Sequence, residues 1–155
     1  MKRETKVVEG LGKYKTLAME DLVWALTSPS IVDHPLAVQS DWGIQELAGN
    51  QGLVSRLDRA DSGLHRAAGR VGHRLGDYFE TLITTWLREL PTAKVIASNL
   101  QVHGGEGTVG EFDLVFSRDR VVHHWELAVK YYLAHPNRVG GVYWYGPNPK
   151  DRFSL

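Results

Sequence analysis

Apolar residues between positions 61 and 90 recur at the spacing of one helix face. Steps of three and four residues place side chains on the same side of a helix, and an apolar side is buried in the core. The residues that follow this spacing are Leu64, Ala68, Val71, Leu75, Tyr78, Phe79, Leu82, Ile83, Trp86, Leu87 and Leu90.

Both ends of this segment carry helix signals. Asp61 or Ser62 can cap its start, and Pro91 marks its end. Three glycines interrupt the segment, and each costs about 1 kcal/mol relative to alanine inside a helix. They are Gly69, Gly72 and Gly76. The pattern therefore predicts a helix over 61–90 with a bend or break near Gly72.

Upstream, the stretch TLAMEDLVWALTSP predicts a second helix from Leu17 to Leu26. Thr16 is a suitable N-cap for this helix, and Pro29 ends it soon afterwards. The following residues mix apolar side chains with Pro, Gly and Asn, which predicts irregular structure with a short helix around 42–47.

After Pro91 the apolar period changes from that of a helix to that of a strand. AKVIASNLQV, VGEFDLVF and VVHHWELAVKYYL predict three successive strands, and residues 142–145 predict a further short one. The fold class expected is α/β, of the α+β sandwich kind, with a long helix packed on a mainly antiparallel sheet. A single domain over 1–155 is expected, with a flexible tail at 1–15, an N-terminal part at 16–60 and the core at 61–155.

The second and third strands form a hairpin whose charges fall on one side. A two-residue turn at Arg118 and Asp119 would place Asp113 opposite His124 and Glu111 opposite Glu126. Since side chains alternate across a strand, one face is then apolar. The other face carries Asp113, Glu126 and Lys130.

Carboxylates gathered on one face repel each other unless a positive charge lies between them. Lys130 supplies one charge, and Mg²⁺ or Mn²⁺ with oxygen ligands would supply more. A metal ion beside a lysine suits phosphodiester hydrolysis, because both stabilise developing negative charge. The alternative is that these charges are solvated on the water-facing side of an antiparallel sheet.

Composition narrows the class of protein. The chain has 155 residues, 43% of them hydrophobic and 23% charged, as in an ordinary globular domain. It has no cysteine, which excludes disulfides and thiolate metal sites. Without a long apolar run or a signal peptide, a cytoplasmic protein with no membrane partner is expected. A net charge of +0 argues against tight non-specific DNA binding but is compatible with a nuclease.

Two weaker signals concern phosphate and metal contacts. Arg66, Arg70 and Arg74 share a side of the predicted 61–90 helix and are candidates for nucleic-acid contact, although a solvated basic stripe has the same pattern. His124 is a candidate metal ligand beside Asp113, or a residue that simply forms hydrogen bonds.

The motifs LGDYFETL, GEFDLVF and HHWELAVKYYL resemble the PD-(D/E)XK nuclease superfamily. Together with LVWALTSP and ASNLQV they resemble more closely a bacterial family known as domain of unknown function 1853, over nearly the whole chain. The resemblance implies a restriction-endonuclease-like core in which Asp113, Glu126 and Glu80 hold Mg²⁺ or Mn²⁺. Lys130 would assist the attacking water, with Glu111 and His124 supporting the ligands. The pattern alone favours Glu80 as a boundary residue of an amphipathic helix.

Two departures from the superfamily pattern qualify this resemblance. Glu126 and Lys130 are spaced as ELAVK rather than Glu-x-Lys, and the chain ends at DRFSL, where another helix of the core would begin. The core is therefore expected to be incomplete at its C-terminus, in a fragment or a shortened protein. The function expected is a magnesium-dependent endo- or exonuclease, with DNA favoured over RNA, in a monomer or homodimer. The alternative is an inactive module that keeps the fold and binds nucleic acid or a protein.

Overall fold

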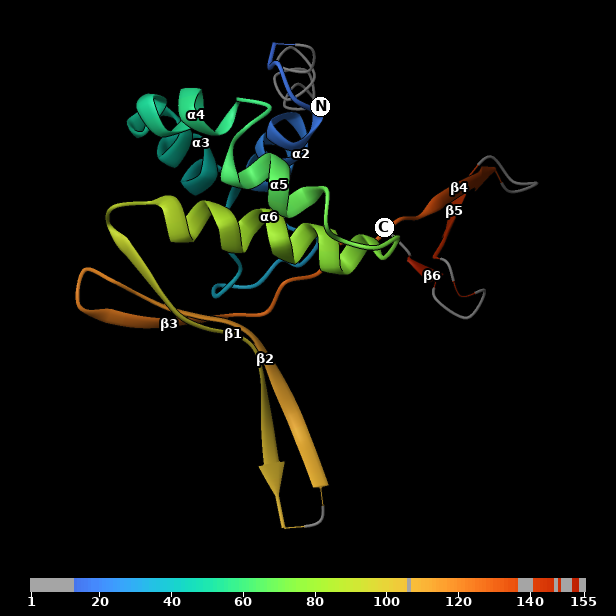
Figure 1. The fold of residues 1–155 in the computed structure, drawn as a ribbon. Coiled ribbons are helices and arrows are strands. Elements are labelled where there is room, and N and C mark those ends of the chain that lie inside the picture. The colour runs from blue at the N-terminus through green and yellow to red at the C-terminus, as the bar shows by residue number, and fades with distance from the viewer. Residues whose placement is uncertain (1–12, 106, 137–140, 147, 149–151, 154–155) are drawn as a thin grey trace.

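The computed structural model describes residues 13–105, 107–136, 141–146, 148 and 152–153, so most of the predicted 1–15 tail lies outside the described residues. Within the described residues, five helices come first and strands in two antiparallel sheets follow (Figure 1). The helices are α2 (Leu17–Thr27), α3 (Ser40–Gly49), α4 (Gln51–Leu57), α5 (Gly63–Ala68) and α6 (Leu75–Glu89). The strands are β1 (Ala93–Gly104), β2 (Gly107–Arg118), β3 (Val121–Trp125), β4 (Leu133–Pro136), β5 (Val142–Tyr145) and β6 (Arg152–Phe153). The predicted mixed fold with antiparallel sheets is confirmed.

Two side chains accept hydrogen bonds from backbone N–H groups at the start of helix α2 and just before it. The Thr16 hydroxyl accepts a hydrogen bond from the N–H of Met19, as predicted for an N-cap. The buried carboxylate of Asp58 accepts hydrogen bonds from the backbone N–H groups of Lys15 and Thr16. Asp58 thus ties the start of α2 to the end of α4, and it satisfies donors that the interior would otherwise leave unpaired.

Helices α2 and α3 approach each other at a glycine. A Cβ atom added at Gly43 would lie 1.8 Å from the carbonyl oxygen of Leu26, so only glycine permits this contact between the helices. The predicted short helix around 42–47 is confirmed and extends over Ser40–Gly49. Helix α4 was not predicted, because Gly52 and Ser55 within it, and Asn50 just before it, weaken the apolar pattern.

The helical pattern over 61–90 forms two helices. Helix α5 begins after Ser62, whose hydroxyl accepts a hydrogen bond from the N–H of His65, and it ends at Ala68. Helix α6 begins at Leu75, so the break expected near Gly72 is confirmed. Arg70 and Arg74 lie in the connection, and the prediction that they share a helix face with Arg66 is wrong for this reason.

Helix α6 supplies one side of the hydrophobic core. Its residues Leu82, Ile83, Trp86 and Leu87 are buried, together with Leu90 just after the helix. From the sheet, Leu114 and Phe116 of β2 are 0% and 2% exposed, so the predicted apolar face of the hairpin packs inward. In Figure 1, α6 lies over the sheet, and the far end of the β1–β2 hairpin extends away from the helices.

The first sheet has the order β1-β2-β3. Its second turn is formed by Asp119 and Arg120, with φ of 51° and 65°, and Arg118 pairs with Val121. The predicted turn at Arg118 and Asp119 is therefore wrong by one residue. A two-residue hairpin turn that matches the twist of its strands requires positive φ at both central positions. The correction shifts the pairing by two residues, so every side chain keeps its predicted face.

The third strand is shorter than predicted. β3 ends at Trp125, and residues 126–132 have no regular secondary structure. The Trp125 ring contacts Phe116 on β2 and Trp42 on α3, at centroid distances of 4.9 and 5.0 Å. These edge-to-face contacts fix the end of the strand against the core.

The second sheet has the order β4-β5-β6 and lies to one side of the helices in Figure 1. Its middle strand covers Val142–Tyr145, as predicted. Leu133 and Val142 are exposed in this sheet. Among the described helices, none is long and apolar enough to cross a membrane.

Candidate functional site

Asp113 is a residue of β2, and it lies beside the point where the chain leaves β3. Leu114 pairs with Trp125, so continuing the same register brings Glu126 opposite Asp113. The N–H of Leu127 donates a hydrogen bond to Oδ2 of Asp113 at 2.7 Å, in place of a bond to a backbone carbonyl of β2. The half-buried Asp113 is thus placed beside the segment that carries Glu126.

Glu80 reaches the same region from α6. Partial burial is the main cause that raises the pKa of the Glu80 carboxyl, and the negative charge of Asp113 is the next. Asp77 and Glu111 raise this pKa further, whereas a hydrogen bond with Asn99 lowers it. Carboxyl groups from α6 and β2 therefore lie near enough to feel each other's charge.

Asn99 is a member of this site that the sequence pattern did not indicate. It has a φ of 52°, in the left-handed region where asparagine is among the few tolerated residues. Its neighbours Ser98 and Leu100 pair with Leu114 and Phe112 of β2, so Asn99 stands opposite Asp113. The sequence carries no clear signal for this role, because the same strand also contains Lys94, Ser98 and Gln101.

Glu126 is exposed and lies beside His124. Its Oε1 atom contacts Nε2 of His124, and the His124 ring packs edge-on against Phe112 at 4.6 Å. His124 thus holds Glu126 at the rim of the site through an ion pair when the imidazole is protonated. The prediction that both side chains lie on the charged face of the hairpin agrees with this contact.

Lys130 was placed on the charged face by strand alternation, and that reasoning is wrong because β3 ends before it. Lys130 is exposed in the irregular segment after β3. The Asp113 carboxylate accepts a hydrogen bond from the N–H of Leu127, and strand alternation alone does not predict this contact. The structure therefore brings Glu80 near Asp113 and Glu111, whereas Glu126 and Lys130 both lie on the irregular segment after β3, which the Leu127 N–H joins to Asp113.

The donor set is compatible with a hard cation, because carboxylate and amide oxygens are the ligands that Mg²⁺ prefers. Glu80, Asp113, Glu111 and Asn99 provide such oxygens. Within the part of the chain that the structure describes, no group of three His, Asp or Glu side chains converges closely enough to hold an ion. The carboxylates of Glu111 and Glu126 are exposed.

A buried ion pair joins the helices to the base of the sheet. Glu46 on α3 and Arg118 at the end of β2 are 2.8 Å apart, with side chains 10% and 23% exposed. Both residues come from segments far apart in the chain, so no local pattern indicated the pair. Its position fixes α3 against the strand that carries Asp113.

A model of the family described as domain of unknown function (DUF1853) matches residues 20–155. No curated protein and no solved structure matches the chain.

Proposed function

The chain belongs to the DUF1853 family, and we propose that it is a metal-dependent nuclease of the PD-(D/E)XK type. The observation that carries this proposal is the gathering of acidic side chains around Glu80, whose pKa is raised first by partial burial and then by the charges of Asp113, Asp77 and Glu111. Carboxylates that destabilise one another are costly in a site that only maintains the fold, whereas a cation between them removes that cost.

Each residue of the site has a role in this proposal. Asp113, Glu126 and Glu80 would hold Mg²⁺ or Mn²⁺, which when bound polarises a phosphate and lowers the pKa of water. Asn99 orients the Glu80 carboxylate through its hydrogen bond. Lys130, on the irregular segment after β3, stabilises negative charge that develops on the phosphate. The substrate class is a phosphodiester of nucleic acid, with DNA favoured over RNA.

A second candidate is a module with the same fold that binds nucleic acid or a protein without cleaving it. Two contacts favour it, because Asp113 and Glu126 each have a protein partner. Asp113 accepts the N–H of Leu127, and Glu126 contacts His124. Carboxylates engaged in this way can stabilise the hairpin end without any metal ion.

Nuclease assays on single- and double-stranded DNA and RNA, with Mg²⁺ or Mn²⁺, test the first proposal. Asp113→Asn keeps a side-chain oxygen that accepts from Leu127 but removes the negative charge, so we expect it to abolish cleavage in a folded protein. Lys130→Ala should slow cleavage with little effect on metal binding. Asp119→Asn is the matched control, since Asp119 is an exposed acid on the turn of the same hairpin.

Cleavage that persists in both Asp113→Asn and Lys130→Ala would contradict the nuclease assignment. Calorimetric titration with Mn²⁺ separates the two candidates, because only the first requires a divalent ion. Binding of DNA by a protein that takes up no Mn²⁺ would favour the binding module.

A further inference from the structure

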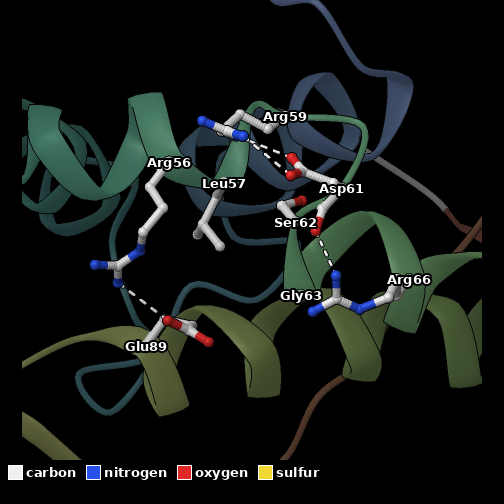
Figure 2. A pocket seen from close by; sticks show the side chains of 8 residues that line it. All are labelled: Arg56, Leu57, Arg59, Asp61, Ser62, Gly63, Arg66 and Glu89. Atoms are coloured by element: carbon white, nitrogen blue, oxygen red, sulfur yellow. Dashed lines mark hydrogen bonds and ion pairs between the residues drawn. The ribbon is translucent and has the colours of Figure 1, made fainter.

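A pocket of about 300 Å³ lies between α4, α5 and the end of α6 (Figure 2). Three arginines, two carboxylates and a serine account for its polar lining. They are Arg56, Arg59, Arg66, Asp61, Glu89 and Ser62. In Figure 2, Arg56 and Arg66 lie on two sides of the pocket, with Leu57 between them. The side chains come from residues 56–66, which include parts of α4 and α5, and from Glu89 at the end of α6.

The charges of this pocket do not cancel. Arg56 forms an ion pair with Glu89 at 3.0 Å, and Arg59 holds Asp61 through Nε and Nη2 at 2.9 and 3.0 Å. Arg66 instead donates Nη1 to the backbone carbonyl of Asp61, which carries no net charge. Three guanidinium groups facing two carboxylates leave one net positive charge in the pocket.

Several N–H groups of these arginines remain available. Arg66 retains Nε and Nη2, and Arg56 retains Nε and Nη1, with no partner for these atoms within the described residues. Two guanidinium forks on opposite sides of a hollow match the geometry with which arginine binds phosphate oxygens in pairs. The Ser62 hydroxyl, which accepts from His65, can still donate its own hydrogen.

Helix geometry separates the pocket from the acidic site. Glu80 and Glu89 are both on α6, and about two and a half turns lie between them, which places them on opposite sides of the helix. An anion in the pocket therefore does not meet the carboxylates around Glu80. A phosphodiester bound at the acidic site would likewise have α6 between it and Arg66.

We propose that this pocket binds a phosphate group, with Arg66 and Arg56 as its principal contacts and Arg59 as a third. The shared chemistry is a phosphate dianion, carried either by a small metabolite or by the phosphorylated end of a nucleic acid. Binding shifts Arg56 from Glu89 toward the phosphate, because a dianion offers more acceptor oxygens than the single carboxylate. This site does not depend on the nuclease proposal.

Titration with inorganic phosphate, followed by calorimetry in a buffer free of other divalent anions, tests the proposal. Arg66→Gln should weaken phosphate binding by about tenfold or more, since a charge-assisted contact to phosphate is lost. Arg66→Lys keeps the charge but loses the fork, so an intermediate affinity is expected. Arg70→Gln is the matched control, because Arg70 is exposed and lies outside the pocket lining.

Equal phosphate affinity of the Arg66→Gln and Arg70→Gln proteins would overturn the proposal, as would absence of phosphate binding by the unchanged chain. Thermal unfolding of each variant establishes that it is folded. Competition by a 5′-phosphorylated oligonucleotide, but not by the same oligonucleotide with a 5′-hydroxyl, would identify a nucleic-acid end as the source. Competition by small phosphate monoesters alone would identify a metabolite. Both outcomes require the Arg66 contact and so support the site.

Discussion

The backbone N–H of Leu127 donates a hydrogen bond to Oδ2 of Asp113 at 2.7 Å. This contact replaces the next step of the β2–β3 ladder and turns the chain out of the sheet after Trp125. Asp113 therefore has two separable properties, an oxygen that ends a strand and a charge that lies near Glu80.

Asp113→Ala and Asp113→Asn should separate these properties. The alanine variant leaves the partly buried N–H of Leu127 without its acceptor, so we expect a loss of about 1–3 kcal/mol in the free energy of unfolding. The asparagine variant keeps an acceptor oxygen and should lose much less. Urea denaturation of the two variants measures the difference, and equal losses would show that the hydrogen bond contributes nothing.

Glu80→Gln should change how stability depends on pH. Because the pKa of Glu80 is raised above 4.5 in the folded chain, the folded state holds this proton more tightly than the unfolded state. The resulting stability is present in full below pH 4.5 and is lost as pH rises through the raised pKa. Glutamine does not ionise, so the Glu80→Gln protein does not lose this stability. Its melting temperature should exceed that of the unchanged protein, and the difference should grow as the pH rises from 4.5 toward neutral. A difference that does not vary with pH would contradict this account.

Arg118→Met should be strongly destabilising, because it leaves Glu46 as an unpaired buried charge. Breaking one partner of such a pair costs about 3–5 kcal/mol. Within the described residues, Glu46 Oε2 and Arg118 Nη1 have no hydrogen-bond partner, so the pair is incompletely satisfied even when intact. The double variant Glu46→Met with Arg118→Met should therefore recover most of the loss. Chemical denaturation of the single and double variants tests this, and additive losses would count against a coupled pair.

Gly43→Ala should also destabilise the protein, by about 1–3 kcal/mol or more, as overpacking does. The new methyl group would collide with the carbonyl oxygen of Leu26. Because this atom belongs to the backbone of α2, it cannot move aside as the end of a flexible side chain could. Gly52→Ala is the matched control. It lies in α4 with open space around it, so alanine should stabilise that helix by about 0.5–1 kcal/mol. Thermal unfolding of the two variants in parallel shows whether each one raises or lowers stability. Similar effects at the two positions would refute the packing explanation.

Local patterns predicted the parts of the fold that local interactions determine. The Thr16 cap, the break near Gly72 and the strand at 142–145 each rest on neighbouring residues, and each is present. The β2–β3 register was wrong by two residues, because both pairings satisfy the apolar pattern equally. The turn decided between them, through the backbone conformation of Asp119 and Arg120.

The sequence predicted which side chains share a face of the hairpin, but not where the strand ends. Alternation placed Asp113 and His124 on one face, in agreement with the β2–β3 pairing, but it extended the strand through Glu126 to Lys130. The hydrogen bond from the Leu127 N–H to the Asp113 side chain, beyond the end of the strand, cannot be seen in a periodic pattern. The arginine pocket was missed for a different reason. Arg56, Arg66 and Glu89 belong to segments that only the packing of three helices brings together.

The order of strands along the chain has a consequence for the folding rate. β1, β2 and β3 are consecutive neighbours joined by short turns, so closing each pair costs little chain entropy. The contact between Glu46 and Arg118 instead closes a long loop, and such contacts form late in folding. Disrupting it should therefore accelerate unfolding while leaving the refolding rate almost unchanged, so that the pair governs how long a folded molecule survives.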